Sequence, residues 1–183
     1  GAPDTGGWTA RVIPNLFPIL KGDTGPAEHP AGANRVPAAG VSEVIIDSPV
    51  HDRTRWELGS GQVLTMLDIY QERIRALAAA GGIRYVHIMR NHKAAGASSL
   101  EHPHSQLFGM PFIPTLIDIE LDGFTMAEQG RAACVLCEEL RREEEEKARV
   151  IAVTDNFVAF CPFASRQPYE AWIAPRRHEL HFE

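Results

Sequence analysis

The alternation of apolar runs and turn residues along this chain predicts mainly short strands. Residues 8–20 are largely apolar, but Pro14 and Pro18 cannot donate backbone hydrogen bonds, so we expect an interrupted strand there. A stretch rich in Gly, Pro and Ala at residues 21–40 predicts a loop. The other expected strands are residues 42–49, 83–89, 105–113 and 169–175, together with a hairpin at 150–163.

Two segments have the pattern of helices. Residues 60–80 begin at Ser60, a plausible N-cap, and end before a pair of glycines, as helices often do. Residues 131–150 predict a second helix, whose run RREEEEK we interpret as a solvated face. The apolar face expected for the first helix consists of Val63, Leu67, Ile74 and Leu77.

A weak internal repeat suggests that the chain contains two related units. Residues 43–51 resemble residues 170–178: each segment begins with Glu, continues as an apolar strand with Pro, and ends in His. We therefore predict an α+β fold in which residues 1–125 form most of a first unit and residues 126–183 begin a second. A Cys pair precedes the second unit, so the repeat predicts a corresponding pair ahead of residue 1, in a longer architecture.

The composition mainly narrows the classes of binding partner and cellular setting that we expect. The net charge of −6 and the pI near 5.8 disfavour binding to nucleic acids or anionic membranes, which requires basic patches. No apolar run approaches the roughly 20 residues of a membrane span, and we expect no signal peptide. Three cysteines, two of them in CVLC, suit a metal site better than a disulfide framework and predict a reducing, cytoplasmic setting.

The block EHPHSQ carries the main candidate chemistry. In an extended segment His102, His104 and Gln106 point to the same side, because the period of a strand is two. A neutral imidazole can bind a metal, act as a base or attack an electrophile, and histidine suits phosphoryl or nucleotidyl transfer. The alternative is a pair of surface histidines beside a turn.

The residues before this block favour the transfer hypothesis. The small side chains of AAGASS, residues 94–99, let backbone N–H groups approach phosphate oxygens closely. Asn91 and Lys93 add a neutral polar group and a cation at the entrance to this loop. We therefore prefer a phosphate-handling site to two unrelated histidines.

The motif CVLC predicts a metal site. Cys134 and Cys137 have the spacing of a zinc half-site, and the repeat aligns His178 as a third ligand. His51, the equivalent residue of the first unit, could share another zinc ion with His102. A redox pair and two core cysteines one helical turn apart are the alternatives for CVLC.

These motifs together resemble the galactose-1-phosphate uridylyltransferase branch of the histidine-triad superfamily, which includes ADP-glucose phosphorylase. The His-Pro-His block in its context is the most specific element, supported by GWTARVIPNLFPIL, SEVIIDSPVH, CVLC and FVAFCPFASRQPYEAWIAPRRH. The resemblance implies two histidine-triad-like units, each an antiparallel sheet with helices packed on it. It also implies structural zinc at one or two sites and a homodimer.

The resemblance further implies a role for individual residues. His104 would be the nucleophile, Gln106 would hydrogen-bond the phosphoryl group on it, and Ser99 would contact the departing or incoming phosphate. Glu120 lies where other members place an iron ligand, a role that CVLC argues against. The implied nucleotide-binding residues are Asn15, Phe17, Asn91 and Ser98. The implied zinc ligands are His51 and His102 at one site, and Cys134, Cys137 and His178 at the other.

The implied reaction is a double displacement. UDP-glucose would transfer its uridylyl group to His104, and galactose 1-phosphate would then take it up. An ADP-glucose phosphorylase with the same histidine chemistry is one alternative, and a zinc-stabilised nucleotide-binding module without turnover is another. The chain departs from the family pattern at Lys93, where glycine is preferred, and in lacking the family's first Cys pair.

Overall fold

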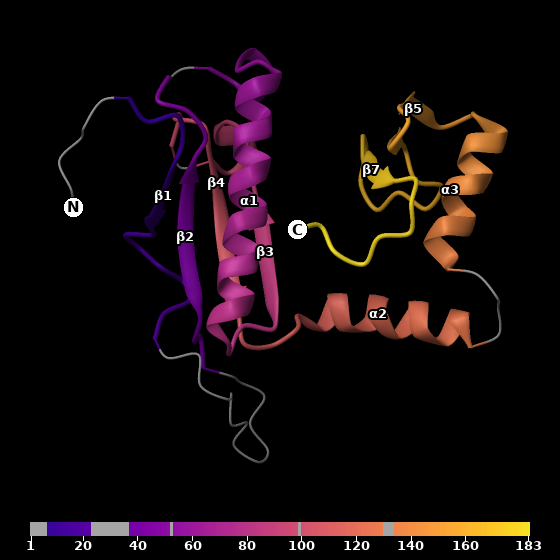
Figure 1. Cartoon of the computed structure of the whole chain (residues 1–183), viewed down its shortest axis with the longest axis horizontal. Coiled ribbons are helices and arrows are strands. Elements are labelled where there is room, and N and C mark those ends of the chain that lie inside the picture. The colour runs from indigo at the N-terminus through magenta and orange to yellow at the C-terminus, as the bar shows by residue number, and fades with distance from the viewer. Residues whose placement is uncertain (1–6, 23–36, 52, 99, 130–133) are drawn as a thin grey trace. The chain divides into compact units, whose positions relative to one another are not determined.

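The computed structural model divides the chain into two compact units (Figure 1). Unit 1 extends to Pro114, and unit 2 comprises Thr115–Phe182. This division lies before residue 125, where we expected the first family unit to end, because one helix spans that position. The boundary between related units remains a prediction. The structure describes residues 7–22, 37–51, 53–98, 100–129 and 134–183.

Unit 1 is built on an antiparallel sheet of four strands in the order β1-β2-β4-β3. The predicted strands are confirmed, although each is shorter than its apolar run, and most of the loop expected at 21–40 lies outside the described residues. The strands are β1 (Arg11–Pro14), β2 (Val41–Ile46), β3 (Tyr85–Met89) and β4 (His104–Met110).

Helix α1 (Ser60–Ala80) covers one face of this sheet (Figure 1). The predicted helix is confirmed, but its expected N-cap is wrong, because Gly59 is the N-cap residue. The expected apolar face is wrong in part. Leu67 is 37% exposed, whereas Met66 and Tyr70, which we had not counted, are 1% and 8% exposed. The buried core of unit 1 consists of Ile45, Met66, Tyr70, Leu77 and Leu107.

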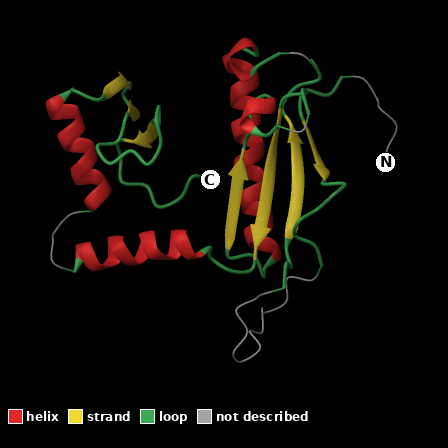
Figure 2. Cartoon of the chain, turned by 180° about the vertical axis from the view of Figure 1, so that it is seen from behind, coloured by secondary structure: helices red, strands yellow, loops and turns green. Residues whose placement is uncertain are grey.

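The opposite face of the sheet carries the candidate chemistry. Leu107 points into the core beneath α1, and successive strand residues point to opposite faces. His104 and Gln106 therefore project from the face that α1 does not cover, which is turned to the viewer in Figure 2. Two short 3₁₀ turns, η1 (Arg55–Glu57) and η2 (Ala94–Gly96), belong to the loops that follow β2 and β3.

Unit 2 contains a second antiparallel sheet, in the order β5-β6-β7, and two helices. The hairpin and the last strand are confirmed, and α3 is confirmed but shorter than expected. We did not predict α2, because its apolar side chains form no clear buried stripe. The elements of unit 2 are α2 (Thr115–Glu128), α3 (Val135–Glu146), β5 (Val150–Val153), β6 (Phe157–Phe160) and β7 (Trp172–Pro175).

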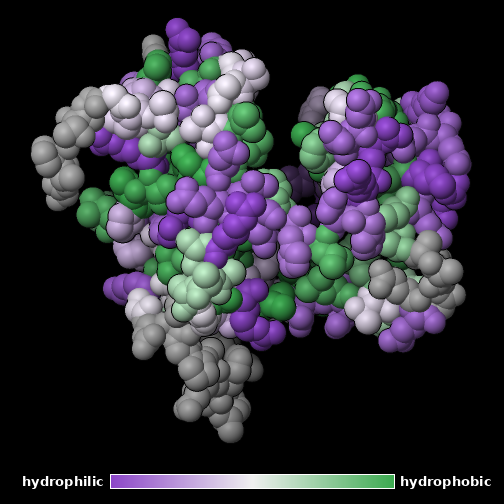
Figure 3. Space-filling view, viewed as in Figure 1, coloured by the Kyte–Doolittle hydropathy of each residue, from purple (hydrophilic) through white to green (hydrophobic). Residues whose placement is uncertain are grey.

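The charged run of α3 is not uniformly solvated. Hydrophilic surface dominates the part of Figure 3 where this helix lies, in agreement with the prediction for most of RREEEEK. Glu143 is nevertheless fully buried, and Arg149 Nε donates to both of its carboxylate oxygens at 2.9 and 3.0 Å. These hydrogen bonds raise the pKa of Arg149. Glu143 is therefore part of the packing between α3 and the β5 segment.

No helix in the described parts of the chain is both long enough and apolar enough to cross a membrane.

Candidate functional site

The site in unit 1 forms where β2 ends and β4 begins. The Asp47 backbone N–H donates to the Pro103 carbonyl at 3.1 Å, which holds the two strand ends together. His51 and His102, 51 positions apart, meet there with 3.0 Å between their Nδ1 atoms. The sequence prediction had grouped these two residues, and the structure brings them together.

The hydrogen bond at Nε2 of His102 leaves the Nδ1 lone pair of its ring directed toward His51. Its Nε2 lies 2.7 Å from the Ser48 carbonyl oxygen, which can only accept, so Nε2 carries the proton. The Nδ1 of a neutral His102 can then accept from His51 or bind a metal ion. Metal-binding histidines typically use their second N–H in this way, to fix the ring against a carbonyl. The pair therefore fits two ligands of one zinc ion.

His104 is held in one tautomer by the same argument. It is 8% exposed, and its Nδ1 lies 2.8 Å from the His102 carbonyl oxygen. Because that oxygen only accepts, Nδ1 carries the proton and Nε2 keeps its lone pair. Gln106, two residues further along β4, projects from the same face of the sheet. This arrangement can present a nucleophilic nitrogen beside an amide donor.

A buried ion pair lies behind this strand end, on the side of α1. Asp47 is fully buried, and its carboxylate pairs with Arg90. Ser105 Oγ donates to the same carboxylate at 3.5 Å, and Gln62 Nε2 donates to the Asp47 carbonyl at 2.6 Å. Burial lowers the pKa of Arg90. Sequence reasoning missed this pair because 43 positions separate its members and neither belongs to a motif.

The small-residue loop forms a closed turn. The Lys93 carbonyl accepts the N–H groups of Gly96 and Ser98 at 3.1 and 3.0 Å. Asn91 Nδ2 donates to the Ala97 carbonyl at 3.3 Å, so this predicted nucleotide contact also braces the loop. Ser98 Oγ, another predicted contact, donates to a backbone carbonyl within the loop. Ser99 lies outside the described residues.

The structure does not bring the predicted nucleoside contacts next to His104. The Asn15 N–H donates to the Ser42 carbonyl, while His104 pairs with Ile46, four positions along β2. That separation is about 13 Å along the strand. Asn15 Oδ1 accepts the Phe17 N–H at 3.0 Å, and the Phe17 side chain is 82% exposed. The two residues therefore form a separate, solvent-facing turn at the other end of β1.

A second candidate site lies in unit 2. Cys134 is the N-cap residue of α3, Cys137 lies in its first turn, and His178 follows β7. The Cys137 Sγ and His178 Nδ1 atoms are 3.3 Å apart, and one ligand atom from each of the three residues lies within 4.8 Å of the others. Two thiols with an imidazole form a preferred donor set for zinc. The residues fit this metal, and the nearby imidazole favours a metal site over a redox pair.

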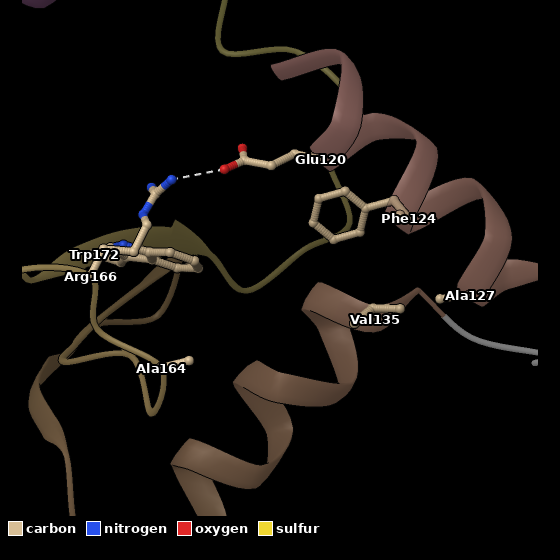
Figure 4. Close-up of a pocket in the computed structure, with 8 residues that line it drawn as sticks. Glu120, Phe124, Ala127, Val135, Ala164, Arg166 and Trp172 are labelled. Carbon is tan, nitrogen blue, oxygen red and sulfur yellow. Dashed lines mark hydrogen bonds and ion pairs between the residues drawn. The ribbon is translucent and has the colours of Figure 1, made fainter. Parts of the chain in front are cut away.

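Glu120 is engaged in a different contact. Arg166 Nη1 donates to its carboxylate at 2.9 Å across a pocket of about 350 Å³ in unit 2 (Figure 4). In the described part of the chain, the group of three side chains that could hold a metal ion is the Cys134 cluster, which does not include Glu120. The pocket combines this ion pair with the aromatic rings of Phe124 and Trp172.

Comparison with known proteins identifies the family. Residues 11–114 match the family described as galactose-1-phosphate uridyl transferase, N-terminal domain. The chain belongs to the galactose-1-phosphate uridyl transferase family. The resemblance inferred from the His-Pro-His block and the predicted α+β fold with antiparallel sheets are thereby confirmed.

The similar proteins of known name have two different activities. ADP-glucose phosphorylase from Arabidopsis thaliana is 32% identical over 96% of this chain and 49% of its own length. Galactose-1-phosphate uridylyltransferase from Thermotoga maritima is 30% identical over 90% of this chain and 52% of its own length. The chain therefore spans about half the length of the curated relatives it matches.

Solved structures of the family superpose on nearly the whole chain. A uridylyltransferase structure gives a TM-score of 0.88 at 30% identity and covers 100% of this chain and 58% of that one. The structure of ADP-glucose phosphorylase from Arabidopsis thaliana with bound ADP-glucose gives a TM-score of 0.83 at 30% identity, covering 96% and 54%. The chain is thus similar to members of both activities.

Proposed function

We propose that this chain belongs to a nucleotidyltransferase in which His104 carries the nucleotidyl group between a nucleoside diphosphate sugar and a phosphate acceptor. The observation that carries the proposal is the hydrogen bond between His104 Nδ1 and the His102 carbonyl. It leaves the Nε2 lone pair available and aligns the ring without help from a separate side chain. A nucleophilic histidine needs this tautomer in order to attack phosphorus.

The proposed reaction has two displacements on the same phosphorus atom. In the first, His104 Nε2 attacks the α-phosphorus, an N–P bond forms, and the bond to the bridging oxygen breaks. The sugar 1-phosphate leaves with that electron pair. In the second, a phosphate oxygen of the acceptor attacks, the N–P bond breaks, and Nε2 regains its lone pair. The Nδ1 proton stays on the ring throughout, where the His102 carbonyl stabilises the positive charge that develops.

Other residues near His104 are proposed to bind the substrate. The Gln106 amide, on the same face of β4, would donate to the phosphoryl oxygens, and Ser99 would contact the departing or incoming phosphate. Asn91 and Ser98 would contribute from the loop. A nucleotide lying along the open face, with its phosphate at His104, would direct its nucleoside toward the turn with Asn15 and Phe17.

We propose UDP-glucose as the donor and galactose 1-phosphate as the acceptor, in a homodimer. The support for these substrates is the named activity of the Thermotoga maritima relative and of several others. ADP-glucose is the second candidate donor, because the Arabidopsis thaliana relative at 32% identity is an ADP-glucose phosphorylase and its structure contains ADP-glucose.

Zinc is proposed to be structural. His51 and His102 would contribute to one site, and Cys134, Cys137 and His178 to the other. A zinc ion with four ligands has no open coordination position, so it would fix the protein ligands and not polarise the substrate. His51 and His102 would then fix the segment 102–104, in which a proposed zinc ligand and the proposed nucleophile are two residues apart.

Intact-protein mass spectrometry distinguishes the two donors. We expect incubation with UDP-glucose to add one acid-labile UMP group to the chain, because a phosphoramidate bond hydrolyses readily in acid. An AMP group from ADP-glucose, with no addition from UDP-glucose, would replace the proposed donor by the second candidate. Absence of an adduct with both donors would contradict nucleotidyl transfer by this chain and leave a binding or structural role.

Replacement of Cys137 by Ser tests the zinc site of unit 2. We expect the zinc content to fall by about one ion per chain and the melting temperature to decrease, because the binding free energy of a structural zinc ion contributes to folding. Metal analysis after dialysis, combined with thermal unfolding, would measure both. Cys161→Ala is the matched control, because Cys161 lies outside the cluster. An unchanged zinc content in Cys137→Ser would contradict the proposed site.

A further inference from the structure

Lys93 adopts a backbone conformation that is unusual for any residue other than glycine. Its φ is 58° and its ψ is 173°. This combination lies at the edge of a region that glycine occupies almost exclusively, since a Cβ atom there is strained. Ala97, in the same loop, has a φ of 60° but a ψ of 27°, which is the more tolerated left-handed helical region. Lys93 therefore adopts this backbone conformation at a cost in conformational free energy that glycine would not incur.

The surrounding contacts keep Lys93 in this conformation. Its carbonyl accepts two N–H groups, from Gly96 and Ser98, on the far side of the turn. On the near side, the His92 ring packs edge-on against Trp56, with 4.9 Å between ring centroids. These contacts restrain the loop before and after Lys93. A strained non-glycine residue in such a loop points to a role for its side chain.

The location of the loop indicates what that side chain could bind. β3 ends at Met89, which pairs with Gln106, so the chain reaches Lys93 just beyond the edge of the sheet where β4 begins with His104. Lys93 is exposed to solvent. Its positive charge therefore lies at the same end of the sheet as the proposed nucleophile.

Glu57, an acidic group that Lys93 influences electrostatically, is largely engaged elsewhere. Glu57 has a lowered pKa, chiefly because of hydrogen bonds from the Thr54 side chain and backbone, and to a smaller extent because of Arg53 and Lys93. The Thr54 N–H donates to the Glu57 carboxylate at 2.7 Å. Glu57 thus closes its own turn, while Arg53 and Lys93 are two cations in one neighbourhood.

We propose that Lys93 binds the phosphate attached to the sugar, the group that leaves in the first displacement and attacks in the second. This inference rests on the proposed function and adds a specificity residue to it. A sugar 1-phosphate carries more negative charge when free than within the nucleotide sugar, and an ammonium group offers three donors to its oxygens. Lys93 thereby selects a phosphorylated acceptor over neutral nucleophiles such as water.

Calorimetric binding of galactose 1-phosphate tests this role without requiring turnover. We expect Lys93→Ala and Lys93→Gly to raise its Kd about tenfold, because a charge-assisted contact is lost, and Lys93→Arg to raise it less. Binding of galactose, which has no phosphate, should not respond to any of these changes. Lys93→Gly should also raise the melting temperature by about 2–4 °C as the strain is relieved, whereas Lys93→Ala should not.

Arg53→Ala is the matched control, because it removes a cation from the same neighbourhood. We expect it to change the Kd by less than about twofold, as a screened charge that makes no direct contact. Equal effects of Arg53→Ala and Lys93→Ala would indicate a diffuse field and overturn the proposal. So would wild-type affinity in Lys93→Ala, or a melting temperature that does not rise in Lys93→Gly.

The adduct measurement separates this inference from the proposed function. An adduct that forms on both the wild type and Lys93→Ala, and that galactose 1-phosphate discharges equally fast from both, overturns the role of Lys93 alone. Conversely, galactose 1-phosphate binding that depends on Lys93, in a chain that forms no adduct with either donor, supports the phosphate site and overturns nucleotidyl transfer.

Discussion

Replacement of His104 by Ala is expected to lower the rate of nucleotidyl–enzyme formation by a factor on the order of 10⁴ or more, as removal of a catalytic nucleophile does in other enzymes. His104 Nε2 is the lone pair that the hydrogen bond at Nδ1 leaves available. Alanine has no atom that can form the N–P bond, and water at this position would give hydrolysis and no adduct. The rate can be followed by rapid quenching with radiolabelled UDP-glucose and ADP-glucose.

Two controls show whether this loss is chemical. His87→Ala removes an exposed imidazole from β3, on the same face of the sheet, and should leave the rate within about twofold, as surface substitutions usually do. The zinc content of His104→Ala should equal that of the wild type, because His104 is not a proposed ligand. An adduct that still forms at the wild-type rate would transfer the nucleophilic role to another residue. A loss of zinc would indicate disruption of the strand end.

His102 couples the proposed zinc site to the proposed nucleophile through two different groups. Its ring binds the Ser48 carbonyl through Nε2 and contacts His51 through Nδ1, while its backbone carbonyl accepts the hydrogen bond from His104 Nδ1–H. A side-chain substitution at His102 would remove the ring contacts but not the backbone carbonyl itself. The position of that carbonyl nevertheless depends on the segment that the ring anchors. The His-Pro-His spacing therefore has a physical reason beyond placing two rings on one side.

The features that local pattern determines could be predicted from the sequence. The strands around Ile45 and Leu107 and the hairpin at 150–163 follow from apolar runs and turn residues, and the period of two put His104 and Gln106 on one face. The family followed from the His-Pro-His block. These signals lie within short stretches of the chain, where neighbouring side chains determine the local secondary structure and the motif.

The features that depend on distant partners could not be predicted. Asp47 and Glu143 are charged, so the pattern treats them as surface positions, yet both are fully buried because Arg90 and Arg149 reach them. Helix α2 was missed because its apolar residues are spread around the helix, with many of them exposed, so the sequence shows no single apolar stripe. Ion pairs between distant residues, and the face of a helix that becomes buried, depend on the packed chain. A short stretch of sequence does not contain this information.

Replacement of Asp47 by Asn is expected to destabilise unit 1 by about 3–5 kcal/mol, because it leaves the buried guanidinium of Arg90 without its counter-charge. Asp47 is 0% and Arg90 15% exposed at the side chain, so water screens this pair little. Equilibrium unfolding in urea, followed by tryptophan fluorescence, measures the change. A Trp172→Phe background restricts the signal to Trp8 and Trp56, which belong to unit 1.

The double variant Asp47→Asn with Arg90→Met decides whether the pair or the packing is responsible. If the unpaired charge causes the loss, removing Arg90 as well should recover part of it, so that the double variant is more stable than Asp47→Asn alone. Arg141→Ala breaks an ion pair whose side chains are 62% and 61% exposed, and should cost less than about 1 kcal/mol. A double variant no more stable than Asp47→Asn would locate the loss in the hydrogen bond from Ser105 Oγ and in local packing. The strand end beneath His104 would then be held by shape and hydrogen bonding, with the ion pair contributing little.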